Sequence, residues 1–503
     1  MSSPTSTASS TRCSSPVEDC EKQVSPKLDT SSVEAQPEEP ALDTPKGLRR
    51  AAILAVLCSA QFFDIFNACA SIAALPSIGK DLGFTLGMLQ WVLAAYTLTF
   101  GAFQVPAGRL SDIYHPKPVF VVGYLAVGVF SILCGVSVDP IMLIVFRAMS
   151  GLGAAMTIPS AIAMIVQSFP DPSEQSRALG LYGAFGAIGN SVGFVLGGIL
   201  VAKASWRWVF YLIGIATIPF AVFAYFFLPK VTVQENTVKR KIDVPGITIL
   251  TGGLILFVYA VSDGGARGWG SPQIIATLVL SIVFFVGFFF VERYVQDPAI
   301  PPRTWFNKNF AVMFFYAWSV YWNLLAGELQ LVQVFQDLFL WSPIKTALHF
   351  LPFGITGGIS TLVAGSYGHL VPRRILLVAG QLFMAVGVTL FALADTEDKY
   401  WSHIFPGMII NMVGIAVAYV AASVTTMASA PKGEEGVVGA ILYTSFQIGS
   451  TIGIAIVSSI SLSVNQKLPL DALSQHQGYA ASLWSVLGMH GIMIVISLIF
   501  VRD

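Results

Sequence analysis

The stretch PVFVVGYLAVGVFSILCGVS, residues 118–137, contains no charged side chain. An α-helix rises about 1.5 Å per residue, so a helix of this length reaches across a hydrocarbon core about 30 Å thick. Apolar runs of this length are typical of membrane spans and are rare in soluble domains, where helices are shorter and amphipathic. The stretch is therefore predicted to be a transmembrane helix.

Similar apolar runs continue on both sides of this stretch. The weakest of them is the seventh in the chain, because it is short and runs into the glycine-rich segment from Asp263 to Gly270. A re-entrant pair formed by the seventh and eighth runs is the alternative at that point. Together with 118–137, the runs predict an all-α polytopic membrane protein with fourteen spans. The other expected spans are 50–75, 88–107, 141–164, 178–202, 208–229, 245–262, 273–292, 309–335, 344–366, 374–394, 402–428, 436–462 and 480–500.

Two polar segments interrupt the apolar pattern. Residues 1–47 are rich in Ser, Thr, Pro and Glu and contain no apolar run, so they are expected to form a disordered tail and not a signal peptide. Residues 230–243 are polar and are expected to form a linker after the sixth span.

Composition supports a membrane protein and argues against several functions. Hydrophobic residues make up 55% of the 503 residues and charged residues 11%, against about 25% charged in a typical soluble domain. The net charge of zero gives no reason to expect nucleic acid as a partner. The chain lacks a GxxxxGK[ST] loop, so we expect no ATP-driven pump and no cofactor. The five cysteines and six histidines show no metal-binding or catalytic spacing, so we expect neither a metal site nor an enzyme.

Loop charge predicts the orientation of the chain. If the amino terminus is cytoplasmic, the inner loops contain most of the basic residues, among them Arg49, Arg109, Lys117, Lys239 and Arg373. This distribution follows the positive-inside rule. With an even number of spans, both termini are expected in the cytoplasm.

The first predicted span carries a polar stripe around one carboxylate. Asp64 lies near its middle, and Gln61, Asn67 and Ser71 fall on the same broad helical face. A charged group inside a bilayer costs about 2.5–3.5 kcal/mol on insertion scales, so it is a candidate functional group by default. Asp64 is expected to bind a proton or contact a substrate. The alternative is a structural carboxylate that is hydrogen-bonded to neighbouring helices.

Three other ionisable residues inside predicted spans are also candidates for function. Glu328 lies beside Asn323 and Gln330 in the ninth span and is a second candidate for coupling, unless it sits near the outer interface. Arg147 in the fourth span either couples to a carboxylate or snorkels to the membrane surface. His490 in the fourteenth span is either a proton relay or a core histidine whose hydrogen bonds are satisfied.

The loop after the second span reads GRLSDIYHPK, residues 108–117. It resembles the cytoplasmic loop signature of the major facilitator superfamily, written G-x-L-a-D-r-x-G-r-K, in which Gly108, Leu110, Asp112 and Lys117 match. Other positions depart from it, including His115 in place of a glycine. The resemblance implies a gating loop formed by Gly108, Asp112 and Lys117. Asp112 is expected to cap a helix amino terminus or to pair with a basic residue across the interface between the halves.

Two further segments resemble the same superfamily. Residues 147–155 of the fourth span, Arg147-Ala-Met-Ser-Gly-Leu-Gly-Ala-Ala, resemble the R-x-x-x-G-x-G-a-a helix, which implies a coupling role for Arg147. The fifth span matches the glycine spacing of the antiporter signature but has Phe194 in place of its proline. A row of glycines allows close helix approach, and the loss of the proline removes an expected hinge. The matching glycines are Gly180, Gly189, Gly193, Gly197 and Gly198.

Other segments are similar to one branch of the superfamily, the fourteen-span drug:proton antiporters, and particularly to its fungal aminotriazole-resistance-like members. They are 63–67 with 74–76, 205–210, 263–265 and 268–269, and the likeness covers about residues 48 to 500. It implies two six-helix bundles that meet at a midplane substrate site, with two inserted helices between them. The implied bounds are 48–229 for the N-terminal bundle, 244–292 for the inserted helices and 293–503 for the C-terminal bundle.

The resemblance implies a proton-coupled exporter of small organic compounds, either drugs and toxins or an endogenous secondary metabolite. We expect a monomer in the plasma membrane whose partners are its substrate, protons and the lipid bilayer. An exporter of an organic acid, a glycolipid or borate, or a proton symporter or facilitator of the same fold, is the alternative. Aromatic residues of the ninth and tenth spans are expected either to line the substrate cavity or to pack in the core and lipid belt. They are Phe314, Phe315, Tyr316, Trp318, Tyr321, Trp322 and Phe350.

Overall fold

The computed structural model describes residues 48–84, 86–89, 91–228, 243–295, 298, 300, 302–306, 309–431, 434–466 and 472–501. Every regular element among these residues is a helix, as predicted. The expected disordered tail, 1–47, and residues 230–242 of the expected linker lie outside the described residues.

The N-terminal part consists of six long helices and one short one. The long helices have 20 to 35 residues each, and every one coincides with an expected span. They are α1 (Leu48–Leu82), α3 (Trp91–Tyr114), α4 (Pro116–Gly135), α5 (Pro140–Ser168), α6 (Pro172–Lys203) and α7 (Arg207–Phe227), with the four-residue α2 (Leu86–Leu89) between α1 and α3.

The next two helices, α8 (Val244–Arg267) and α9 (Pro272–Val291), pack against each other as a hairpin. Each is long and apolar enough to cross a bilayer, which favours two spans over a re-entrant pair. The helix ends inside the glycine-rich segment, as the sequence indicates, but later than the expected end at residue 262. α8 continues through Asp263 to Arg267, where the Arg267 Nε donates to the Asp263 carboxylate one turn earlier, at 2.6 Å. That local ion pair allows the charged end of the helix to persist.

The C-terminal part is again helical and contains three π-helical segments. Its first membrane segment joins α10 (Phe310–Tyr321), the π-helix η2 (Trp322–Ala326), α11 (Gly327–Gln333) and the π-helix η3 (Val334–Leu338). Such wide turns inside helices are rare and often mark functional sites. The remaining elements are η1 (Pro302–Phe306), α12 (Pro343–His349), α13 (Leu351–Tyr367), η4 (Gly368–Leu370), α14 (Arg373–Ala392), η5 (Glu397–Lys399), the π-helix η6 (Tyr400–Ile404), α15 (Phe405–Met427), α16 (Glu435–Asn465) and α17 (Ala472–Phe500).

Thirteen helical segments in the described part of the chain are long and apolar enough to cross a membrane. The expected second span, α3, is not among them although it has 24 residues, which corresponds to about 36 Å. α3 is less apolar because it carries polar groups such as Gln104, which is fully buried against other helices. With α3 included, a helix occupies each of the fourteen expected positions.

Several helices begin with an acidic or hydroxyl residue followed by proline. Asp139 accepts hydrogen bonds from the backbone N–H groups of Ile141 (2.9 Å) and Met142 (3.2 Å), and Pro140 occupies the first helical position of α5. Asp171, Ser271 and Ser342 precede α6, α9 and α12 in the same way, and Asp243 caps α8 with Val244 between it and Pro245. These caps satisfy backbone donors at helix starts, and the proline has no N–H group to satisfy.

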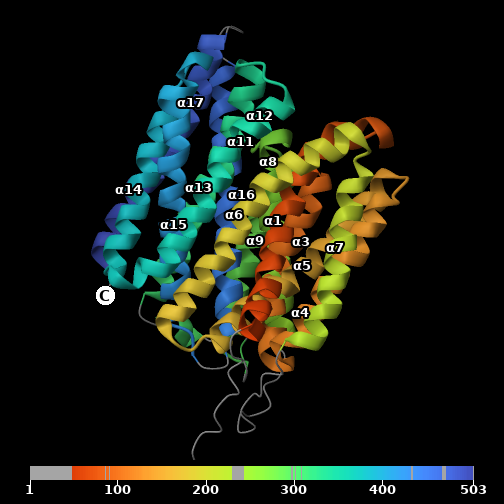
Figure 1. Ribbon diagram of the computed structural model, residues 1–503, viewed down its shortest axis with the longest axis vertical. Helices are drawn as coiled ribbons and strands as arrows, with labels where there is room; N and C mark the ends of the chain where they lie inside the picture. Colours follow the sequence, from red (N-terminus) through yellow and green to blue (C-terminus); the bar gives the residue numbers. More distant parts are fainter. Residues whose placement is uncertain are drawn as a thin grey trace, which may run out of the picture. The chain divides into compact units, whose positions relative to one another are not determined.

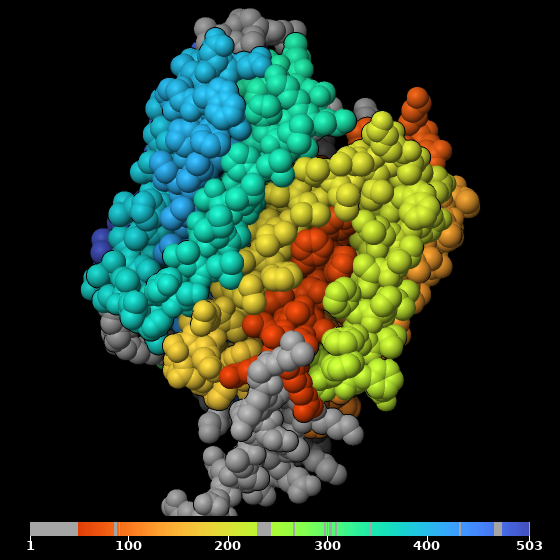
Figure 2. Space-filling view, viewed as in Figure 1, coloured from red at the N-terminus to blue at the C-terminus, as the bar shows by residue number. Residues whose placement is uncertain are grey.

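Helix α6 packs against both halves of the chain. In Figure 1, α14, α15 and α17 lie on one side, α4, α5 and α7 lie on the other, and α1, α6, α13 and α16 lie between them. Figure 2 shows α1 on this face between α6 and α7. A Cβ atom added at Gly189, Gly193 or Gly197 would press on the backbone of α1, whereas one at Gly180 would lie 2.7 Å from Gly365 of α13. The small residues therefore permit two close helix contacts, one with α1 in the same half and one with α13 in the other half.

The second contact between the halves joins α3 and α16. A Cβ atom at Gly108 would lie 2.6 Å from the Ala440 Cβ, and one at Gly101 would lie 2.9 Å from the Gln447 side chain. α8 contacts both α3 and α16 and so lies along this contact. The halves thus meet along two lines, α6 with α13 and α3 with α16.

We expect Gly193→Leu to destabilise the protein, because its Cβ would lie 2.9 Å from the Cys69 Cβ and 3.0 Å from the Phe66 carbonyl oxygen. Overpacking of this kind typically costs about 1–3 kcal/mol. The matched control is Gly198→Leu, since a Cβ there meets no atom within 4 Å. Thermal unfolding in detergent should show a lower midpoint for Gly193→Leu alone. Equal midpoints for the two variants would mean that the α1–α6 contact tolerates side chains.

Candidate functional site

A cavity of about 140 Å³ lies where the two halves meet. Helices α1, α3 and α6 line one side, and the end of α10 together with η2, α13, α15 and α16 lines the other. Among the described residues that line it, Asp64 is the one carboxylate, and Gln61 lies beside it. The first two residues of the predicted stripe on α1 therefore face a space between the halves.

The aromatic lining differs from the one expected. Of the aromatic residues predicted in the ninth and tenth spans, Tyr321 lines the cavity, while Tyr316 is buried and donates its hydroxyl to the Leu377 carbonyl oxygen at 2.8 Å. Tyr419 and Tyr443, whose hydroxyls are hydrogen-bonded to each other, also line the cavity but come from α15 and α16. Sequence reasoning missed these two tyrosines because only the fold brings their helices to the same cavity.

Asp64 is held by a tyrosine from the neighbouring helix. The Tyr96 hydroxyl on α3 donates to the Asp64 carboxylate at 2.5 Å, and both side chains line the cavity. Hydrogen bonds to a charged acceptor are shorter and stronger than those between neutral groups. This contact positions the carboxylate at the cavity wall, where it can meet a proton or a polar group of a substrate.

Arg147 lies behind Tyr96 and is fully buried, so the snorkelling alternative is wrong. Its Nε donates to the Val92 carbonyl oxygen at 2.8 Å, and its Nη1 donates to the Asn67 side-chain oxygen at 2.7 Å. The guanidinium also lies 4.6 Å from the centre of the Tyr96 ring and 5.6 Å from that of Phe210. Cation–π contacts of this kind are strongest when the cation is desolvated. Tyr96 thus contacts the carboxylate through its hydroxyl and the arginine through its ring.

Glu328 is buried within the protein. Its carboxylate accepts a hydrogen bond from the Asn190 side-chain nitrogen at 3.2 Å. Asn190 lies on α6 and lines the cavity, whereas Glu328 on α11 does not. The structure therefore places the second candidate carboxylate one residue behind the cavity wall, across the boundary between the halves.

Asn67 does not line the cavity but accepts a hydrogen bond from Arg147, and three further predicted polar residues also lie outside the cavity. Asn323 exchanges side-chain hydrogen bonds with Asn411 at 3.0 and 3.4 Å, and Gln330 accepts one from Ser482 at 3.1 Å. His490 is fully buried, and each of its ring nitrogens lies within hydrogen-bonding distance of a side-chain amide oxygen. Asn323, Gln330 and His490 belong to the interior of the C-terminal helices.

The predicted gating loop joins the two halves through Asp112. Its carboxylate accepts hydrogen bonds from the backbone N–H groups of Gly436 (2.8 Å) and Val437 (2.9 Å) at the start of α16. Glu434, which precedes α16, makes no capping bond with its side chain, so Asp112 supplies the cap from the other half. Gly108 makes the approach possible, because a Cβ there would lie 2.5 Å from the Gly436 carbonyl oxygen.

Lys117 is the one predicted gating residue that points elsewhere. Its Nζ donates to the Leu228 carbonyl oxygen at 2.5 Å and lies 5.9 Å from the centre of the Tyr225 ring. Because a helix leaves its last carbonyl groups unpaired, a lysine at that end supplies a donor and a favourable charge. Lys117 therefore fixes α4 to α7 within one half.

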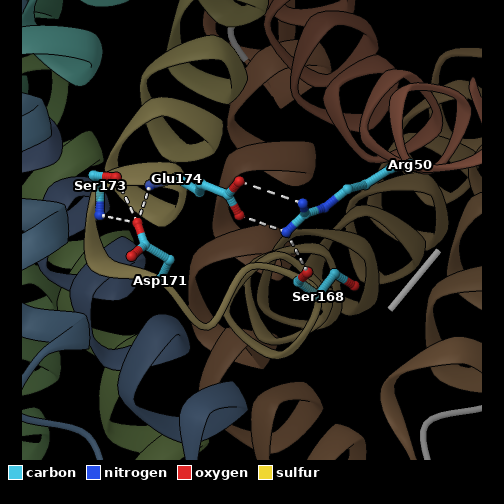
Figure 3. Close-up of polar contacts among 5 residues, drawn as sticks. All are labelled: Arg50, Ser168, Asp171, Ser173 and Glu174. Atoms are coloured by element: carbon cyan, nitrogen blue, oxygen red, sulfur yellow. Dashed lines mark hydrogen bonds and ion pairs between the residues drawn. The ribbon is translucent and has the colours of Figure 1, made fainter. Parts of the chain in front are cut away.

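A polar cluster fixes the start of α1 to the turn between α5 and α6 (Figure 3). Arg50 donates to the Glu174 carboxylate at 2.6 Å and to the Ser168 carbonyl oxygen at 3.4 Å. Asp171 caps α6 and accepts a hydrogen bond from the Ser173 hydroxyl at 2.5 Å. That hydrogen bond is the main reason why the pKa of Asp171 lies below its ordinary value.

The segment 205–210, singled out in the sequence, fixes the other end of α1. Asp81 accepts hydrogen bonds from the Trp206 indole N–H at 3.0 Å and from Arg207 at 2.5 Å. Arg207 also donates to the Ser137 carbonyl oxygen at 3.2 Å, after α4. The segment thus joins α1, α4 and α7.

Comparison with known proteins assigns this arrangement of helices to a family. The profile described as Major Facilitator Superfamily matches residues 57–454. Puromycin resistance protein pur8 of Streptomyces alboniger is 33% identical over 415 residues, covering 81% of each chain. Multidrug transporter mfsC of Aspergillus fumigatus is 29% identical, covering 86% of this chain and 83% of its own. A low affinity ammonium transporter of Saccharomyces cerevisiae is 28% identical, covering 93% of each chain.

A solved structure agrees with the fold. The crystal structure of the human organic anion transporter MFSD10 superposes with a TM-score of 0.64 and covers 90% of this chain and 100% of its own. Its sequence identity is 15%, so the likeness concerns the fold alone.

We expect Asp112→Ala to loosen the contact between α3 and α16, because a lost helix cap costs about 0.5–2 kcal/mol. The ratio of joined to separated forms should fall about two- to thirtyfold. Spin labels at the exposed positions Tyr114 and Ala428 report the distance between the halves. Asp171→Ala is the matched control, since Asp171 caps a helix within its own half. Identical distance distributions in all three proteins would show that the Asp112 cap does not hold the halves together.

Proposed function

The chain belongs to the major facilitator superfamily, and from this premise we propose that it is a proton-coupled secondary transporter that exports small organic compounds. The observation that carries the proposal is Asp64, the one carboxylate among the described residues of the cavity wall, which is held by Tyr96 with the Arg147 cation behind it. The names of two relatives, a puromycin resistance protein and a multidrug transporter, support export of organic compounds.

Asp64 is suited to couple proton movement to substrate movement. A carboxylate on a cavity wall between two halves can take up a proton from one side and release it to the other when the halves move. Tyr96 stabilises the ionised form by donating a hydrogen bond. When a substrate competes for the same carboxylate, proton and substrate bind in turn, which is the condition for exchange.

The moving bodies in this proposal are the N-terminal bundle, 48–229, and the C-terminal bundle, 293–503. The two bundles touch along α6 with α13 and along α3 with α16. When the bundles rock about the cavity, the helices of these contacts must separate at one end of the cavity while they stay together at the other. The Asp112 cap closes one end. The inserted pair, 244–292, follows the α3–α16 contact, and residues 230–243 connect it to the first bundle.

Loop charge supports one orientation of the protein in the membrane. We propose that both termini and the Asp112 end of the cavity face the cytoplasm, in keeping with the positive-inside rule. In this orientation the cytoplasmic end is the one closed by the cap. We propose the plasma membrane as the location, a monomer as the working unit, and transport without catalysis of a chemical reaction.

A second candidate function is movement of a small cation such as ammonium. One relative that matches 93% of this chain is named a low affinity ammonium transporter. The cavity volume of about 140 Å³ also falls below the range of about 300–1,000 Å³ typical of drug-sized ligands. The small volume also agrees with a closed conformation of a larger cavity, because the Asp112 cap, which joins the two halves, is formed.

We expect Asp64→Asn to fold and insert normally but to lose gradient-driven transport, by about a hundredfold or more, since the amide cannot carry a proton. Asp64→Glu keeps a carboxylate and should retain part of the activity. Uptake of puromycin and of methylammonium into inverted vesicles with an imposed pH gradient measures both variants and both candidate functions. Full gradient-driven uptake of either probe by the asparagine variant would remove Asp64 from the coupling mechanism.

We also expect substrate to move opposite to protons. In vesicles of reconstituted protein, an acidic interior should drive probe uptake, and an ionophore that collapses the gradient should abolish it because the chain has no ATP site to sustain pumping. Puromycin uptake beyond that of protein-free vesicles would support the exporter of organic compounds, and methylammonium uptake beyond that of protein-free vesicles, without puromycin uptake, would support the second candidate. If the probe instead accumulates on the side toward which protons flow, the protein is a symporter and the proposal of antiport is wrong.

A further inference from the structure

Two segments singled out in the sequence, 263–265 and 268–269, lie where α8 ends and the turn to α9 begins. No step of the proposed transport uses them. Tyr259, near the end of α8, stacks on Trp91, the first residue of α3, with ring centres 5.9 Å apart. Asp112 lies near the other end of α3. The turn between α8 and α9 is therefore at the end of α3 opposite the Asp112 cap, and we call these two ends the far end and the cap end.

A ring of polar contacts fixes this turn. Tyr259, Asp263 and Arg267 follow one another at intervals of four residues and so lie on one face of α8. Arg267 donates from Nε to the Asp263 carboxylate at 2.6 Å and from Nη1 to the Gln273 side-chain oxygen of α9 at 3.0 Å. The Gln273 side-chain nitrogen donates in turn to the Tyr259 hydroxyl at 2.8 Å. These contacts join α8 to α9 and hold Tyr259 where it stacks on Trp91.

Two glycines place the Trp269 indole against α8. A Cβ atom added at Gly264 would lie 2.8 Å from the Trp269 ring, so a methyl group there would have to displace the indole. Gly268 adopts a φ of +87°, in the left-handed region that favours glycine. The indole N–H of Trp269 then donates to the Ser459 hydroxyl of α16 at 3.0 Å. The glycines of the two segments thus direct one side chain toward the C-terminal half.

The indole and the Asp112 cap hold opposite ends of the same helix. Twenty-three residues separate Gly436, which the cap contacts, from Ser459, and this corresponds to about 35 Å along α16. Both contacts are formed in this structure. The α3–α16 line is therefore held at both ends, which agrees with the small volume of the cavity, about 140 Å³.

We propose that the inserted helices are a latch for the far end of the cavity. The Trp91–Tyr259 stack holds them on α3, and the Trp269 indole holds α16. When the bundles separate at the far end, the bond between Trp269 and Ser459 breaks first, because it is a single hydrogen bond between neutral groups, whereas the polar ring supports the stack. The latch rests on the proposed movement of the bundles, but it needs neither a proton nor Asp64.

Cys69 of α1 lines the cavity, so its labelling reports the opening of either end. A membrane-impermeant maleimide outside sealed vesicles reaches Cys69 through one end of the cavity in right-side-out vesicles and through the other in inverted ones. Asp112→Ala identifies the cap end as the side from which it raises the labelling rate. Subtraction of the rate in the matching Cys69→Ser protein removes labelling of other cysteines. With opening faster than the chemistry, the rate is proportional to the open fraction.

Trp269→Phe removes the indole N–H but keeps an aromatic ring, and Ser459→Ala removes the acceptor. Each should raise labelling through the far end about two- to tenfold, the range expected for the loss of one neutral hydrogen bond, and should not raise labelling through the cap end. The double variant should label no faster than either single variant, because both remove the same contact. Gly264→Ala should act in the same direction, since its methyl group displaces the indole.

Two matched controls lie close in chemistry to these variants. Ser463→Ala acts one turn further along α16 on a hydroxyl that donates to the Ile460 carbonyl oxygen of its own helix, at 3.0 Å. Trp208→Phe acts on a half-exposed tryptophan that packs edge-on against Tyr211 of its own helix. Both controls should label at the natural rate through both ends.

Natural labelling rates in Trp269→Phe and Ser459→Ala would overturn the latch. Equal increases through both ends, or the same increase in the two controls, would also overturn it, because they indicate general loosening of the protein. Labelling needs no substrate and no proton gradient. The latch can therefore fail while the Asp64 experiment succeeds, and the reverse.

Discussion

The burial of the Arg147 guanidinium is the constraint on which the N-terminal helices depend. A cation in the bilayer interior must find hydrogen-bond acceptors and aromatic faces within the protein, because lipid offers neither. Asn67 of α1 and the Val92 carbonyl oxygen of α3 supply the acceptors, and Tyr96 and Phe210 supply the faces. One side chain on α5 therefore fixes the relative positions of α1, α3 and α7. Asp64 reaches the cavity because Tyr96, in contact with this arginine, also donates to it.

Two helix contacts depend on the absence of side chains along α6, one within the N-terminal half and one between the halves. Gly189, Gly193 and Gly197 bring α6 against α1, while Gly180 brings it against α13. The signature proline is replaced by Phe194, which stacks on Phe350 with ring centres 6.3 Å apart. The helix therefore exchanges an expected backbone hinge for an aromatic contact with the other half.

The halves differ in how they bury charge and polarity. In the N-terminal half, a carboxylate and an arginine both contact Tyr96. Two ion pairs, Arg50 with Glu174 and Arg207 with Asp81, fix the two ends of α1. The C-terminal half instead contains an uninterrupted network of amides around His490. Ionic contacts fix the geometry of the first half, and the amide network joins α14, α15 and α17 to η2 in the second.

The sequence by itself determined the helical class, the fourteen positions of the helices and the candidate carboxylate, because hydropathy over a bilayer leaves few alternatives. The loop and glycine motifs also identified Asp112 and the row on α6, since both require particular residues at fixed spacing. Only the tertiary structure decided which polar residues meet. It separated Lys117 from the Asp112 contact and placed Glu328 behind Asn190. It also brought tyrosines of α15 and α16 to the cavity. Such pairings join helices far apart in the chain, and a single helix's periodicity shows which face is polar but not which neighbour that face contacts.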